Sequence, residues 1–192
     1  MKTMETISWS QYSKKFNEIL EMDSPTPPYN KEAYLNYVKL NKSRQNRWLK
    51  KGVLSEEIKN IVSKLKSEQK WIVITEPWCG DASHSLPFLK LIADLSTKID
   101  LQIVYRDSPP EIINEYLTDN GKAIPKLIIR DKNDEDLAIW GPRPEPCQKL
   151  FKEMRANNTS QEEQKITLQN WYNNDKGQTL QDEIKILLEN CR

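Results

Sequence analysis

Cysteine and histidine are scarce in this chain, which limits the kinds of site it can hold. Among 192 residues there are three cysteines, Cys79, Cys147 and Cys191, and His84 is the only histidine. An odd number of widely spaced cysteines is not the disulfide framework of a small secreted domain. Because no paired cysteine motif accompanies the lone histidine, a structural zinc site is not expected, and neither is any other metal or cofactor.

Long hydrophobic runs and an excess of one charge are lacking as well. No segment approaches the ~20 apolar residues of a membrane span, and residues 1–20 lack the apolar stretch of a signal peptide. The 29 basic and 28 acidic residues leave a net charge of +1, which gives no reason to expect a nucleic-acid partner. These features predict a cytoplasmic protein that binds neither membrane nor nucleic acid.

Helical patterns occupy the first third of the chain and return at its end. Serines at the expected capping positions and apolar residues at helical spacing predict helices over about 8–22, 31–50 and 55–67. Gly52 ends the second of these. After Gly141, three more helices are predicted, near 147–154, 161–172 and 180–189.

Between residues 71 and 142 the pattern alternates between strands and helices. Short apolar runs predict strands at 71–75, 101–105, 126–129 and 137–140, and helices are predicted at 82–96 and 109–119. This order implies a parallel pair joined by a right-handed crossover, followed by an antiparallel hairpin. We therefore divide the chain into an N-terminal helical extension (1–70), a core (71–142) and a C-terminal helical extension (143–192), which together form one compact domain.

The residues with the clearest chemical meaning are Trp78-Cys79-Gly80-Asp81-Ala82, which directly follow the first predicted strand. A cysteine at the point where a strand becomes a helix lies near the free N–H groups of the helix start, which stabilise a thiolate. We therefore expect a lowered pKa for Cys79. Position 82, where a dithiol redox site carries its second cysteine, is alanine.

Four features of this region together resemble the thioredoxin family. Trp78-Cys79-Gly80 matches the start of the family motif Trp-Cys-Gly-Pro-Cys, and Pro87 lies where thioredoxins carry the proline of the active-site helix. Ile124-Pro125 matches the cis-proline site, and Gly141 matches the glycine after the last strand. The resemblance implies an α/β, thioredoxin-like fold, with a central mixed sheet of about four strands flanked by helices and with helical extensions at both ends.

The resemblance also implies roles for individual residues. Cys79 is the thiol that attacks a disulfide, while a cis Pro125 holds the backbone of Ile124 close to the sulfur, where an extended substrate segment can pair with it. Trp78 covers one side of this groove, and the adjoining motif residues Gly80 and Asp81 complete it.

Three departures separate the chain from the family pattern. Ala82 replaces the second cysteine, so no disulfide can form within the motif. Asp81 replaces the motif proline and places a negative charge beside Cys79, although it also suits a helix cap. Val73 replaces the buried aspartate that serves the second cysteine of thioredoxins. Loss of the second thiol and of its base together is chemically consistent.

Other residues are candidates for modulating the thiol. His84 follows Cys79 by five positions, and Arg106 and Arg143 lie at predicted strand ends, where either guanidinium can lower a thiol pKa or bind a carboxylate. Each also has a purely structural interpretation, as a packing histidine or a surface ion pair. Glu76 is expected to be a solvated charge at the groove edge, and Cys147 is expected to pack as a small apolar residue.

Three functions remain open on this basis. The first is thiol–disulfide exchange by a monothiol route, in which Cys79 forms a mixed disulfide with a protein or a small thiol such as glutathione. The second is a binding or adaptor module that kept the groove and lost turnover. The third is a resemblance to monothiol glutaredoxins that bind an iron–sulfur cluster, from whose Cys-Gly-Phe-Ser motif Asp81 and Ala82 depart. The sequence does not predict the oligomeric state.

Overall fold

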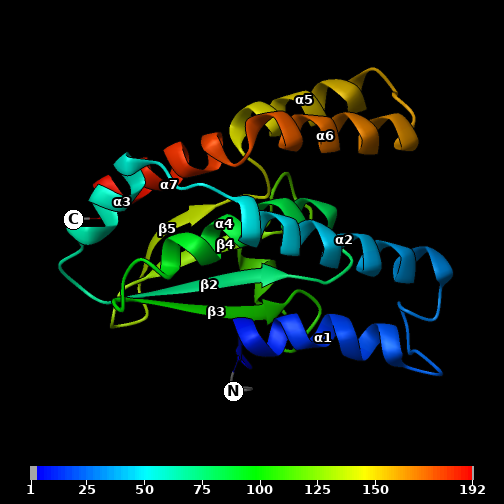
Figure 1. Ribbon diagram of the computed structural model, residues 1–192, viewed down its shortest axis with the longest axis horizontal. Helices are drawn as coiled ribbons and strands as arrows, with labels where there is room; N and C mark the ends of the chain where they lie inside the picture. Colours follow the sequence, from blue (N-terminus) through cyan, green and yellow to red (C-terminus); the bar gives the residue numbers. More distant parts are fainter. Residues whose placement is uncertain (1–3, 192) are drawn as a thin grey trace.

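The structure, a computed structural model that describes residues 4–191, contains a mixed five-stranded sheet surrounded by helices (Figure 1). The strand order is β1-β3-β2-β4-β5. The strands are β1 (Ile7–Ser8), β2 (Gln69–Thr75), β3 (Ile99–Tyr105), β4 (Lys126–Arg130) and β5 (Asp136–Trp140). This architecture confirms the predicted α/β fold with helical extensions.

The central strand β2 determines the topology of the sheet. It pairs in parallel with β3, from Gln69 opposite Ile99 to Thr75 opposite Tyr105, and antiparallel with β4. Its run Trp71-Ile72-Val73-Ile74 is buried on both faces, as the β-branched sequence predicts for a strand covered on each side. The predicted parallel pair and the predicted β4–β5 hairpin are both present.

The N-terminal extension consists of three helices that begin and end close to the predicted points. They are α1 (Trp9–Glu21), α2 (Glu32–Lys51) and α3 (Glu56–Ser63). Ser8 and Gln11 form a capping box at the start of α1, and the Ser55 hydroxyl accepts a hydrogen bond at the start of α3. Helix α2 ends at Gly52, and it packs along α4 (Gly80–Ala93), the helix that follows β2.

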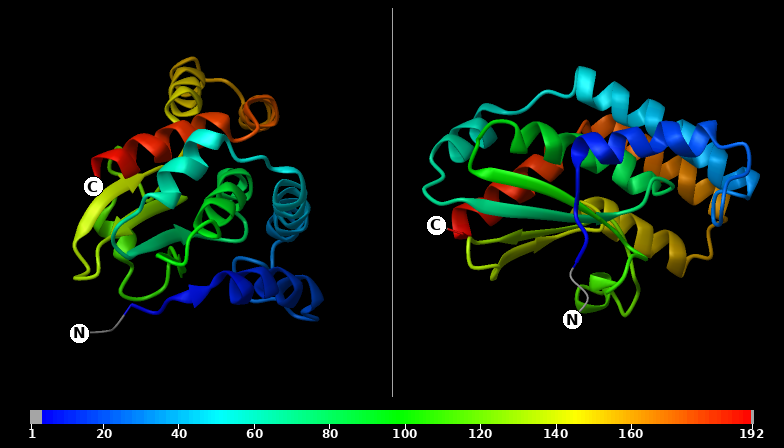
Figure 2. Two further views of the ribbon diagram at one scale, coloured as in Figure 1. Left: turned by 60° about the vertical axis from the view of Figure 1, so that its left-hand side comes forward. Right: turned by 90° about the horizontal axis from the view of Figure 1, so that it is seen from below.

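The C-terminal extension also has three helices, α5 (Glu145–Ala156), α6 (Gln161–Asp175) and α7 (Gln178–Asn190). The pair α5–α6 and helix α1 lie on opposite sides of the molecule, with α2 between them (Figures 1 and 2). Side chains of α2 reach both neighbours: Lys42 donates to Asn17 of α1, and Arg47 donates to Asn173 of α6 at 2.6 Å. The extensions therefore contact one another as well as the core.

Three local features differ from the prediction. The helix expected over 109–119 is only a short 3-10 turn, Ile112–Glu115, because Glu111 at its start adopts a left-handed φ of 55°, which does not fit a helical start. The edge strand β1 was not expected, since two residues are too few to give a periodic pattern. The third helix also ends four residues earlier than the predicted limit of 67.

One hydrophobic core spans the three sequence regions. Val38 and Ile58 from the N-terminal extension, and Ile184 and Leu188 from α7, belong to the same buried cluster as β2. The N-terminal region, the sheet and the C-terminal region thus share one buried cluster. In the part of the chain that the structure describes, no helix has the length and apolar character needed to cross a membrane.

Candidate functional site

Cys79 lies at the junction between β2 and α4, facing the segment that precedes β4. Cys79 is the N-cap residue of α4, and its backbone N–H donates to the Glu76 carbonyl at 3.0 Å. Its Sγ lies 3.4 Å from the carbonyl oxygen of Ile124, to which the thiol donates. The Ile124–Pro125 peptide bond is cis. The structure thus brings together the sulfur and the two residues that the sequence placed opposite it.

Gly141 allows the backbone to pass close behind this segment. Its φ is 108°, and a Cβ at this position would lie 2.3 Å from the Pro125 carbonyl oxygen. Both the backbone angle and the lack of space therefore require glycine here. The glycine after the last strand is explained by its approach to Pro125.

The Cys79 thiol is held in its protonated form, contrary to the expected lowering of its pKa. The side chain is only 6% exposed, and burial raises its pKa to about 12, with the negative charge of Asp81 as the next contribution. The backbone N–H groups of Asp81 and Ala82 and the charge of Arg143 act in the opposite direction. The helix start thus has the predicted effect, but burial outweighs it.

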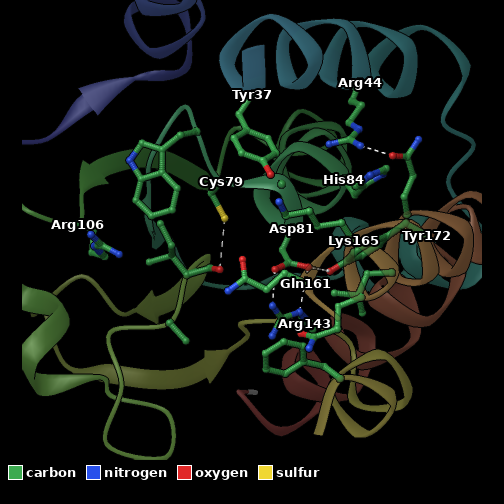
Figure 3. Close-up of a pocket in the computed structure, with 18 of the residues that line it drawn as sticks. Tyr37, Arg44, Cys79, Asp81, His84, Arg106, Arg143, Gln161, Lys165 and Tyr172 are labelled. Atoms are coloured by element: carbon green, nitrogen blue, oxygen red, sulfur yellow. Dashed lines mark hydrogen bonds and ion pairs between the residues drawn. The ribbon is translucent and has the colours of Figure 1, made fainter. Parts of the chain in front are cut away.

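A cavity of about 570 Å³ lies in front of the sulfur (Figure 3). The motif residues Trp78 to Asp81 and Ile124 form one part of its lining. His84, Arg106, Lys122, Ala123 and Arg143 also line it. The helical extensions supply the rest, with Tyr34, Tyr37 and Arg44 from α2 and Phe151, Arg155, Gln161, Gln164, Lys165, Leu168, Gln169 and Tyr172 from α5 and α6. The volume is within the range of pockets that bind small molecules.

Asp81 connects the motif to the C-terminal extension. Its carboxylate forms an ion pair with Arg143 at 2.7 Å and accepts a hydrogen bond from the Tyr172 hydroxyl at 2.9 Å. Both partners of the Asp81–Arg143 pair are largely shielded from solvent, with side-chain exposures of 14% and 12%. The residue that replaces the motif proline thus anchors the loop before α5 and the helix α6 to the start of α4.

His84 packs into the same network. Its Nδ1 accepts a hydrogen bond from the Trp48 indole N–H at 3.0 Å, and its ring stacks on Tyr172 with centroids 4.6 Å apart. Burial lowers its pKa to about 3, with the nearby Arg44 adding to the effect, so the ring is neutral at pH 7. His84 lines the cavity, but it carries no positive charge there with which to stabilise a thiolate.

The two predicted arginines both lie at the cavity, each with a carboxylate partner. Arg106 binds Asp107 through two hydrogen bonds and stands 4.8 Å from the centre of the Trp78 ring. Arg143 stands 4.1 Å from the centre of the Phe151 ring while it holds Asp81. Trp78 and Phe151 thus each provide a flat face for a guanidinium.

Glu76 and Cys147 are both buried in the structure. Glu76 is 9% exposed rather than solvated, and burial raises its pKa to about 7. Cys147 is fully buried, as expected, and burial raises its pKa to about 12. Cys147 does not line the cavity, so it is not placed to resolve a disulfide there.

The sequence did not identify the cavity residues of α2, α5 and α6. Arg44, Tyr37, Lys165 and Tyr172 stand in α2 and α6, and no local pattern in the sequence marks them as site residues. They become site residues only through the packing of helices far apart in the chain. Within residues 4–191, no group of three or more His, Cys, Asp or Glu side chains is arranged to hold a metal ion.

Comparison with known proteins identifies the family. The sequence profile described as thioredoxin matches residues 28–155. That range includes the whole sheet apart from β1, and it also includes α2, α3 and most of α5. No curated protein matches the chain.

Solved structures give the same fold at low sequence identity. A protein of unknown function from Pseudomonas aeruginosa is 16% identical, with a TM-score of 0.62, and the match covers 83% of this chain and 92% of that one. An HIV epitope scaffold is also 16% identical, with a TM-score of 0.56 and coverage of 95% and 98%. At these identities the structural matches show the fold alone.

Proposed function

Since this chain belongs to the thioredoxin family, we propose that it carries out thiol–disulfide exchange by a monothiol route through Cys79. The observation that carries the proposal is the position of the sulfur. It lines a cavity large enough for a small ligand and lies 3.4 Å from the carbonyl of Ile124, the residue before the cis-proline. A disulfide bound in this cavity meets one thiol and no second cysteine in the motif.

The exchange proceeds in two steps, and each step forms one S–S bond and breaks another. In the first, the Cys79 sulfur loses its proton and attacks one sulfur of the substrate disulfide. The Cys79–substrate S–S bond forms, the original S–S bond breaks, and the departing thiolate takes up a proton. In the second, an external thiol attacks the mixed disulfide in the same way and releases Cys79 as a thiol. The substrate is a protein or small disulfide, with glutathione among the candidates for the external thiol.

A second candidate is a binding module without turnover, and the state of the thiol favours it. A pKa of about 12 leaves very little thiolate at neutral pH, and the Asp81 charge adds to this effect. In such a module the cavity holds its ligand non-covalently, and Asp81 joins the helices. The absence of a second cysteine from the motif fits this function equally well.

A turnover assay separates the two functions. With hydroxyethyl disulfide as the substrate and excess glutathione as the reductant, the protein should accelerate disulfide reduction over the uncatalysed rate. Cys79→Ser should abolish this acceleration, while Cys147→Ala combined with Cys191→Ser should retain it. Equal rates for the unaltered protein and the Cys79→Ser variant would support the binding module and exclude the proposed exchange.

A further inference from the structure

We infer that the cavity selects a small disulfide that carries negative charges. The inference rests on the proposed exchange function, to which it adds the chemical class of the substrate. It is drawn from the charges that the lining residues carry and from the partners those charges have.

Basic side chains outnumber acidic ones six to one around the cavity. The single acidic residue is Asp81, and the basic residues are Arg44, Arg106, Lys122, Arg143, Arg155 and Lys165. A buried or half-buried cavity focuses such a charge excess because its walls have a low dielectric constant. The nearly neutral chain therefore concentrates positive charge at one place.

Three of these six cations already have a carboxylate partner. Arg143 pairs with Asp81 at 2.7 Å, Arg106 pairs with Asp107 at 2.7 Å, and Lys122 pairs with Glu111 at 2.5 Å. Half of the six cations are thereby paired, and the other half have no carboxylate partner among these ion pairs.

The remaining three cations come one from each of α2, α5 and α6. Within the described residues, no carboxylate oxygen lies within 4.0 Å of the charged groups of Arg44, Arg155 or Lys165. Figure 3 shows Arg44 and Lys165 on the helical side of the cavity and Arg106 across the sulfur from them. An anionic ligand that reaches Cys79 thus has free positive charge beside it.

Arg44 is held in place by neutral partners. One of its terminal nitrogens donates to Asn41 at 3.1 Å and the other donates to Gln169, while its Nε is buried without a partner. Amide oxygens orient a guanidinium but do not neutralise it, and arginine stays charged even though burial lowers its pKa. The fold therefore bears the cost of placing an unpaired charge at this wall.

The size of the cavity favours a small ligand over a folded protein. Its volume of about 570 Å³ is that of a small-molecule pocket, and residues of α2 and α6 form part of its walls. A disulfide with a carboxylate at each end would place its sulfurs at Cys79 and its charges toward the unpaired cations.

The first experiment compares three disulfides of similar length. Dithiodipropionate is anionic, hydroxyethyl disulfide is neutral and cystamine is cationic. Mixed-disulfide formation is followed by intact mass in the Cys147→Ala/Cys191→Ser protein. We expect dithiodipropionate to react at least about tenfold faster than the neutral probe and cystamine to be the slowest, with the differences shrinking as salt is raised. Equal rates for all three would overturn the inference and leave the exchange function intact.

The second experiment measures charge recognition without exchange. Thiodipropionate has two carboxylates but no disulfide, and thiodiglycol is its neutral counterpart. Calorimetry should detect binding of thiodipropionate to both the unaltered and the Cys79→Ser protein, and no comparable binding of thiodiglycol. Detection of anion binding together with a lack of reaction by every disulfide would refute the exchange function and keep the anion site.

Charge-removing variants locate the site. Lys165→Gln removes the charge of an exposed side chain, and Arg44→Gln removes the half-buried charge; each should weaken thiodipropionate binding about tenfold. Lys149→Gln is the matched control, since Lys149 is an exposed residue of α5 outside the cavity lining. An equal loss in Lys149→Gln, or no loss in Lys165→Gln and Arg44→Gln, would overturn the inference.

Discussion

At the scale of single residues, burial controls the chemistry of Cys79. The helix start and Arg143 favour its thiolate, whereas burial and Asp81 oppose it and raise the pKa to about 12. Sequence alone identified the sulfur, the cis-proline segment and the helix start. It did not predict that the pKa of Cys79 is raised overall, because the burial of the thiol depends on side chains that only the folded chain places over the sulfur.

The raised pKa of Cys79 predicts an unusual pH profile for alkylation. In the Cys147→Ala/Cys191→Ser protein, the rate with iodoacetamide should rise about tenfold per pH unit from about pH 7 to about pH 10 without a plateau. The reason is that the thiolate fraction is still far from saturation throughout this range. A plateau below about pH 8.5 would show an activated thiol instead.

Glu76 predicts a pH-dependent contribution to stability. Its pKa is raised from 4.5 to about 7 by burial, so the unfolded chain loses this proton at a lower pH than the folded one. Folding stability from this group therefore falls as pH rises from about 4.5 to about 7 and stays low above that. Glu76→Gln should be more stable than the unaltered protein at pH 8, by on the order of 2 kcal/mol.

Denaturant unfolding of both proteins at a series of pH values tests this prediction. The difference in unfolding free energy between the two proteins should be small below about pH 4.5, grow between about pH 4.5 and about pH 7, and level off above about pH 7. His84 also titrates, but it is present in both proteins and cancels from the difference. A difference independent of pH would contradict the raised pKa.

At the scale of helices and strands, Asp81 and Tyr172 connect elements that are distant in sequence. The Tyr172 hydroxyl donates to Asp81 of α4, and its ring stacks on His84, which in turn accepts from Trp48 of α2. The strands and most helices were predictable from local periodicity and caps. The 109–119 segment was not, because Glu111 adopts a left-handed backbone angle that periodicity does not report.

The hydrogen bond between Tyr172 and Asp81 predicts the effect of removing the Tyr172 hydroxyl. Tyr172→Phe keeps the stacking on His84 and loses the hydrogen bond to the carboxylate, so unfolding should require about 1–2 kcal/mol less free energy. Tyr105→Phe is the control, since its hydroxyl makes no hydrogen bond within the described residues, and it should change stability little. Equal effects of the two substitutions, measured by chemical denaturation, would show that the Asp81 bond contributes nothing.

At the scale of the whole molecule, the extensions build the site as well as cover the sheet. The sequence predicted three regions in one compact domain, and residues of all three regions belong to one buried core. The cavity itself was not predictable, because Arg44, Lys165 and Tyr172 are brought to Cys79 only by helix packing. Local sequence patterns do not predict that packing.

The shared core predicts that the central region does not fold alone. A fragment of residues 71–142 lacks Val38, Ile58 and Ile184, which are fully buried against it, and it is too short to compensate for the exposed apolar surface. Its proton NMR spectrum should show the narrow amide dispersion of an unfolded chain. A well-dispersed spectrum would show that the core folds independently and does not need the extensions in order to fold.

Trapping the mixed disulfide tests the central claim most directly. The folded Cys191→Ser protein is incubated with dithiodipropionate, quenched with acid and mapped by peptide mass spectrometry. The account predicts one adduct, on Cys79, with none on the buried Cys147, and its removal by excess external thiol. An unmodified Cys79 in the folded protein, alongside full modification of the denatured chain, would contradict it.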